Sequence, residues 1–154
     1  MTVSTSDKRS AHASVRITGP TLDPLVVTLA LRLPHDHAHR DGEPRLRRDR
    51  RNGQVREYAP YRGGMWSMSS KTWVNSHQLD VHVRWLLDQL EERKDALRLL
   101  LVVGVRADIF CYSLGPDAQP PQLPTSTIAR ASALRVEIEI DHYSIGTEED
   151  DDEK

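Results

Sequence analysis

The chain of 154 residues contains one cysteine, Cys111, so it cannot form an intrachain disulfide and shows no sign of an oxidising compartment. It also lacks a long hydrophobic run, because no stretch approaches the roughly 18 apolar residues that a membrane helix needs. The first ten residues, MTVSTSDKRS, have no apolar segment of the kind found in secretory signals. We therefore expect a bacterial protein that resides in the cytoplasm.

Familiar catalytic motifs are missing as well. The sequence has no Gly-x-Ser-x-Gly elbow, phosphate-binding P-loop, dinucleotide fingerprint or His-Glu-x-x-His helix. Cys111 falls on the apolar side of a predicted strand, which favours an inert thiol over a reactive thiolate. Asp108 and Glu137 form a possible carboxylate pair across strands, but charges alternating on a solvated sheet face explain them equally well. These observations predict a protein that is not an enzyme and has no cofactor.

Apolar residues make up 38% of the chain, and their deficit is concentrated at both ends and in the middle. A chain of this length is expected to form one domain with its own core. We predict a single domain over residues 12–145, flanked by disordered ends at residues 1–11 and 146–154. Residues 34–62 show no sustained periodicity and are predicted to be a long Arg-rich loop. The net charge of −2 hides this basic segment and an acidic run in the tail.

Hydrophobic periodicity predicts strands and helices arranged around a central helical block. Strand-like alternation covers residues 12–18, 65–70, 105–113 and 134–142, and helical spacing covers residues 24–33, 76–103 and 124–134. Because at least three strands alternate apolar and polar residues, helices should cover one sheet face and water the other. We predict an α+β fold with a four-stranded, mostly antiparallel or mixed sheet. The arrangement expected is ferredoxin-like (split βαβ), with the central helical block as an addition.

The apolar spacing also predicts which helical residues enter the core. Asp23 should cap the helix over residues 24–33, because its carboxylate can accept a free backbone N–H at the helix start. The expected apolar stripe of that helix consists of Leu25, Val26, Leu29 and Leu33. The central block should form two helices or one kinked helix, with an apolar stripe made of Leu79, Val83, Leu86, Leu87 and Leu90. Ile128 and Leu134 are the expected anchors of the helix over residues 124–134.

Several short segments, taken together, resemble one protein family. They are Leu22-Asp23-Pro24, residues 64–70, residues 83–87, Asp95-Ala96-Leu97, residues 105–112 and the closing strand over residues 134–141. With these motifs, which span roughly residues 12–143, the chain is similar to a bacterial family catalogued as domain of unknown function 4279. The resemblance implies no activity, catalytic residue or cofactor. Residues 40–56 are longer and more basic than the resemblance leads us to expect.

The solvent-exposed face of the predicted sheet, which the helices are not expected to cover, is the first candidate binding surface. Phe110 and Tyr112 alternate onto it from one strand, and Trp66 is expected beside them on another. The same face should carry four acidic residues, namely Asp108, Glu137, Glu139 and Asp141. Acidic side chains repel a phosphate backbone but steer a basic protein partner, which the aromatic rings then anchor. We therefore predict a non-enzymatic protein-binding module, immunity-like or regulatory. The competing interpretation is that the aromatic rings pack beneath a loop or the terminal tail.

The Arg-rich loop is the second candidate surface. Its side chains that suit phosphates and stacked bases are Arg45, Arg47, Arg48, Arg50, Arg51, Tyr58, Tyr61 and Arg62. Because acidic residues such as Asp49 and Glu57 are interspersed among them, a solvated loop of mixed charge is the competing interpretation. Nucleic-acid binding through this loop is therefore the alternative function.

Two further patterns are weaker. His35, His37 and His39 alternate within the predicted loop, but metal sites need ligands on rigid elements, so no metal site is predicted. A small-ligand pocket near the three tryptophans is a third functional alternative.

Overall fold

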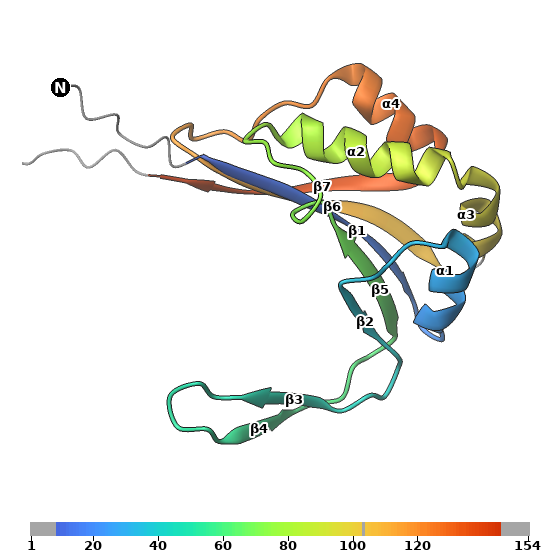
Figure 1. Cartoon of the computed structure of the whole chain (residues 1–154), viewed down its shortest axis with the longest axis vertical. Helices are drawn as coiled ribbons and strands as arrows, with labels where there is room; N and C mark the ends of the chain where they lie inside the picture. Colours follow the sequence, from blue (N-terminus) through green and yellow to red (C-terminus); the bar gives the residue numbers. More distant parts are fainter. Residues whose placement is uncertain (1–8, 103, 146–154) are drawn as a thin grey trace, which may run out of the picture.

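The computed structural model describes residues 9–102 and 104–145. A five-stranded sheet carries four helices on one face, and a two-stranded hairpin projects from the sheet on the other side (Figure 1). The elements in chain order are β1 (Ser10–Gly19), α1 (Pro24–Leu31), β2 (His37–His39), β3 (Arg45–Arg48), β4 (Val55–Tyr58), β5 (Gly64–Ser69), α2 (Leu79–Glu91), α3 (Lys94–Leu100), β6 (Arg106–Gly115), α4 (Thr125–Ala133) and β7 (Val136–Ser144). No helix in these ranges is long and apolar enough to cross a lipid bilayer.

The strands of the sheet lie in the order β2-β5-β1-β6-β7. All neighbours are antiparallel except β6 and β7, which are parallel and joined by α4. The α+β class and the mixed sheet with helices on one face are confirmed. The sheet has five strands rather than the expected four, because residues 37–39 pair with β5 as an additional edge strand. The ferredoxin-like arrangement is not confirmed, since the two strands that α4 connects are direct neighbours, with no strand between them as in a split βαβ unit.

The core lies between the sheet and the helices. Alternate residues of β1, Ala13, Val15 and Ile17, are buried and face the helices, as their spacing predicts. The central block forms two helices, α2 and α3, and the whole predicted stripe of α2 is buried. Burial of this stripe removes enough apolar surface from water to be a main source of stability.

Helices α1 and α4 bury other faces than expected. Asp23 does cap α1, because its carboxylate accepts the backbone N–H of Leu25 at 3.0 Å. The large side chains predicted as core but found exposed are Leu25, Val26 and Leu29 of α1 and Ile128 of α4. The apolar residues that these helices bury instead include Val27, Leu31 and Ala131. Nearly every residue of α1 is apolar. Because apolar and polar residues do not alternate at helical spacing, the sequence does not indicate which face of the helix is buried.

Residues 34–62 are not one long loop. Besides β2, they contain an antiparallel hairpin of β3 and β4, called the arm here, in which all eight strand residues are exposed. The arm extends away from the body on the side of the sheet opposite α2 and α4 (Figure 1). Its turn is closed by hydrogen bonds from the backbone N–H groups of Asp49 and Gly53, and Gly53 takes a positive φ of 68°.

The predicted ends of the domain are tested only in part. β1 begins at Ser10, so the last two residues of the segment predicted to be disordered, residues 1–11, belong to a strand. Residues 1–8 and the acidic tail at residues 146–154 lie outside the described residues.

Candidate functional site

Six of the seven residues predicted for the protein-binding surface share the helix-free side of the sheet, called the outer face here. β6 is flanked by β1 and β7, and the register places their outer residues in rows. The rows are Arg16-Asp108-Glu137, Ser14-Phe110-Glu139 and His12-Tyr112-Asp141. Strand alternation alone thus predicts correctly which residues of β6 and β7 share the outer face.

The aromatic rings of the outer face contact one another and neighbouring cations. The ring of Tyr112 stacks on that of His12, with centroids 4.8 Å apart, and lies 5.6 Å from that of Tyr143. The guanidinium of Arg16 lies over the ring of Phe110 at 4.6 Å from its centroid. Phe110 and Tyr112 are therefore half-buried by side chains of the face itself, and their remaining surface is accessible to a partner.

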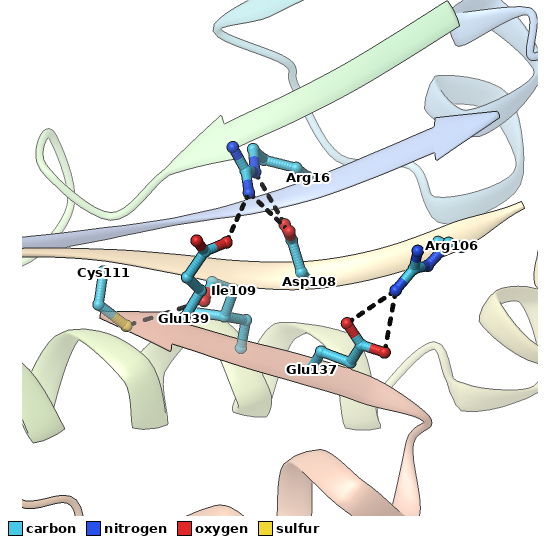
Figure 2. Close-up of polar contacts among 7 residues, drawn as sticks. All are labelled: Arg16, Arg106, Asp108, Ile109, Cys111, Glu137 and Glu139. Atoms are coloured by element: carbon cyan, nitrogen blue, oxygen red, sulfur yellow. Dashed lines mark hydrogen bonds and ion pairs between the residues drawn. The ribbon is translucent and has the colours of Figure 1, made fainter. Parts of the chain in front are cut away.

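Three of the four predicted carboxylates of the outer face contact Arg16 or Arg106, two arginines that were not among the predicted site residues (Figure 2). Arg16 donates two hydrogen bonds to Asp108, of 2.8 and 2.6 Å, and also lies 3.5 Å from Glu139. Arg106 donates to both carboxylate oxygens of Glu137 at 3.0 and 3.1 Å. The hydrogen bonds to Asp108 raise the pKa of the Arg16 guanidinium. The face is consequently less acidic than predicted, and the outward alternation of Arg16 in β1 was the signal that could have shown it.

Asp141 differs from the other carboxylates because its hydrogen-bond partner is a hydroxyl group. It accepts a hydrogen bond of 2.8 Å from Tyr143, and this bond raises the pKa of the Tyr143 hydroxyl. Among the described residues, the only charged partner of Glu139, whose side chain is 65% exposed, is Arg16 at 3.5 Å. These two carboxylates keep most of their capacity to bind an incoming cation.

Trp66, the seventh predicted residue, is not on the outer face. It is fully buried on the helix side of β5, and its indole N–H donates to the hydroxyl of Thr28 in α1 at 3.0 Å. The prediction that Trp66 lies beside Phe110 and Tyr112 on the solvent-facing side of the sheet is wrong. The other two tryptophans, Trp73 and Trp85, stack on each other with ring centroids 6.1 Å apart.

The arm brings most of the predicted nucleic-acid residues together and orders them. Its register pairs Arg45 with Tyr58 and Arg47 with Arg56, and alternation places these four on one side of the hairpin. The guanidinium of Arg45 lies 5.7 Å from the ring centroid of Tyr58 and 5.1 Å from that of Tyr61. Basic side chains surround a hollow of about 540 Å³, whose lining is Arg47, Arg48, Asp49, Arg50, Arg56 and Tyr58.

Two arginines face each other directly across the arm, which is unusual. Like charges at opposite positions of an antiparallel pair repel, and Arg47 lies opposite Arg56. Within residues 9–102 and 104–145, none of the six arginines between positions 45 and 56 forms an ion pair. Arg62 lies apart from them, in a hollow near the ends of β1 and β5. The arm therefore has the charge of an anion-binding element.

The remaining chemically active residues show no catalytic arrangement. Cys111 is buried, and desolvation raises the pKa of its thiol to about 12, which opposes formation of a thiolate. His37 and His39 lie in β2, and His39 stacks on Tyr61 at 3.7 Å between ring centroids. Across residues 9–102 and 104–145, no group of three or more His, Cys, Asp and Glu side chains is placed to hold a metal ion.

Comparison with known proteins identifies the family but no function. Residues 9–145 match the family described as "Domain of unknown function (DUF4279)", so the chain belongs to that family, as its motifs predicted. No curated protein and no solved structure matches the chain.

Proposed function

We propose that this member of the DUF4279 family is a non-enzymatic protein-binding module that holds a basic segment of another protein on its outer face. In this proposal it acts in the bacterial cytoplasm as an immunity-like or regulatory protein. One observation carries the proposal: aromatic rings and carboxylates of β6 and β7 share a sheet face that no described helix covers (Figure 1). Anchoring rings beside charged groups are the composition of specific protein interfaces.

The ion pairs of the outer face are weak enough for a cation of a binding partner to replace one of the arginines. Arg106 and Glu137 are both largely exposed, and a surface ion pair of this kind contributes only about 0–1 kcal/mol to stability. A cation from another protein can therefore take the place of Arg106 at little cost. Covering the half-buried rings of Phe110 and Tyr112 adds about 25 cal/mol for each Å² of apolar surface removed from water.

The test is affinity purification of the tagged protein from its host, with nuclease treatment and mass spectrometry. The wild-type chain should recover one stoichiometric protein that survives nuclease. Reversal of three outer-face charges should abolish recovery, because the partner's basic segment is then repelled; the substitutions are Glu137→Lys, Glu139→Lys and Asp141→Lys.

A matched control reverses three exposed acidic residues elsewhere, by Glu43→Lys, Glu92→Lys and Asp95→Lys. This control should recover the partner normally. Circular dichroism must show that both triple variants are folded. Normal recovery by a folded outer-face variant would show that the surface is wrongly assigned.

A second candidate function, binding of single-stranded nucleic acid, is supported by the facing arginines of the arm. Arg47 and Arg56 repel each other, and a phosphate placed between them relieves the repulsion while Tyr58 offers a ring for base stacking. Binding of an oligonucleotide should then weaken steeply as salt concentration rises, because each neutralised phosphate releases counterions.

The salt dependence can be measured by fluorescence anisotropy with a labelled oligonucleotide. Each lost phosphate contact lowers the slope of log K against log salt by about 0.7 for a single strand. Alanine at Arg47, Arg48, Arg50 and Arg51 should flatten the slope, whereas alanine at the exposed Arg32 and Arg98 should leave it unchanged. Undetectable binding at low ionic strength would exclude this function.

A further inference from the structure

β7 is an edge strand with one unpaired side. It is the last strand of the sheet and is nine residues long. Within the described residues, no loop or cap donates a backbone hydrogen bond to residues 136–144 or accepts one from them. Alternate N–H and C=O groups of such an edge point outward and can pair with another strand.

An apolar groove runs beside this free edge. It has a volume of about 1330 Å³ and lies between β7, α4 and the segment that precedes α4. Its apolar lining includes Ile138 and Ile140 of β7, Leu123, and Ile128, which is 51% exposed. A strand added to β7 would direct alternate side chains into this groove and the others onto the outer face, beside Glu137, Glu139 and Asp141.

The edge therefore fits a strand in which basic and aliphatic residues alternate. In the arm, β3 has that pattern over its first three residues, Arg45, Leu46 and Arg47, and ends in a further basic residue, Arg48. Leu46 and Val55, 63% and 54% exposed, share one side of the hairpin with Arg48 and Glu57 and pack on no described core residue. Arg45 and Arg47 lie on the opposite side.

We propose that the arm of one copy adds to the free edge of β7 in a second copy. β3 then places Leu46 in the groove beside the isoleucines of β7, while Arg45 and Arg47 lie next to the acidic row on the outer face. This contact covers two exposed apolar features, the Leu46 side chain of the arm and the groove beside β7. The contact also places outer-face carboxylates of the second copy beside Arg45 and Arg47, which form no ion pair with any described residue of their own chain.

Charge and topology select this pairing over others. Two β7 strands paired with each other would bring Glu137, Glu139 and Asp141 of both copies together, and like charges across a strand pair repel. The arm follows β2 at one edge of the sheet, and β5, β1 and β6 lie between that edge and β7, so the arm of a chain is separated from its own β7 (Figure 1). The contact is therefore heterologous, and copies add head to tail.

The test is the mass of the purified full-length chain in solution, measured by sedimentation equilibrium with no partner present. The mass should rise with protein concentration and fall as salt rises, because opposite charges steer and hold the contact. An arm variant, Arg45→Glu with Arg47→Glu, and an edge variant, Glu137→Lys with Asp141→Lys, should each be monomeric. Mixing the two variants should restore association. The acidic arm of the first variant then meets the basic edge of the second, and the basic arm of the second meets the acidic edge of the first.

A second pair of variants tests the apolar contact without altering an arginine. Leu46→Asp should prevent association because it places a charge in the groove, whereas Leu99→Asp, at a site 77% exposed on α3, should leave it unchanged.

A monomeric wild-type chain at every concentration and low salt would overturn the proposal, as would failure of two folded variants to associate when mixed. A monomeric chain whose arm binds oligonucleotide would assign the arm to nucleic acid instead. Because this measurement needs no other protein, its failure leaves the proposed partner binding of the outer face standing.

Discussion

At the scale of single residues, one buried polar cluster connects β1, β5 and α2. The hydroxyl of Ser70 accepts the backbone N–H of Ala13 at 3.0 Å and lies 2.6 Å from Nδ1 of His82. Nε2 of His82 lies 2.8 Å from the carbonyl oxygen of Ser76, so Nε2 carries the proton and Nδ1 accepts from Ser70. Every polar atom of Ser70 is thus used in a site without water access.

Substitution Ser70→Ala should destabilise the fold strongly. It leaves two buried groups, the N–H of Ala13 and Nδ1 of His82, without partners, and each unsatisfied group costs about 1–3 kcal/mol. Urea unfolding should show a loss of about 2–6 kcal/mol in the free energy of unfolding. The control Ser69→Ala removes a hydroxyl bonded only to an exposed backbone N–H and should change stability little. Equal unfolding midpoints for the two variants would contradict the role of Ser70.

The alternation of apolar and polar residues along the strands correctly predicted the sheet face of some side chains, but it was misread for Trp66. It placed Phe110 and Tyr112 on the outer face because β6 alternates cleanly. Trp66 was assigned to the wrong face, although Ser67 and Ser69 alternate with Trp66 and Met68 and indicate that the two large side chains point inward. The error was therefore one of interpretation, since the pattern itself was present.

At the scale of elements, the arm was the main feature missed. A hairpin exposed on both sides has no buried face, so its strands need not alternate apolar and polar residues. Asn52-Gly53 in its turn is a known hairpin signal and was the one cue in the sequence. Basic residues on both strands concealed that cue and led to the prediction of a loop.

Removal of the arm should leave the fold of the body intact. Replacement of residues 45–58 by a short Gly-Ser linker removes strands that pair only with each other. Changes on the surface away from packed features usually alter stability by about 0.5 kcal/mol or less, so the thermal midpoint should be nearly unchanged. The comparison is by differential scanning calorimetry at equal protein concentration and high salt, where self-association is suppressed. A loss of stability like that expected for Ser70→Ala would show that the arm packs against the body.

At the scale of the whole molecule, opposite charges lie at opposite edges of the sheet. The net charge of −2 gives no indication of this separation, in which carboxylates line β7 and the arm beyond β2 and β5 carries arginines that form no ion pair with any described residue. The wall of the groove beside β7 is held in place by Arg130 of α4, which donates to Glu91 at 2.7 Å and to Asp88 at 2.6 Å on α2. A fixed groove and a separated charge distribution are the features on which head-to-tail association depends.

The sequence alone determined the α+β class, the family, the strands β1, β5, β6 and β7, and the buried stripe of α2. Each of these follows from local periodicity, because a residue's side of a strand or long helix is decided by its neighbours in the chain. Tertiary structure alone decided the strand order, the fifth strand, the pairing of Arg16 with Asp108 and the face that α1 buries. These depend on contacts between residues far apart in the chain, such as the 92 positions that separate Arg16 from Asp108. Local pattern cannot specify such contacts, because they form only when whole elements pack together.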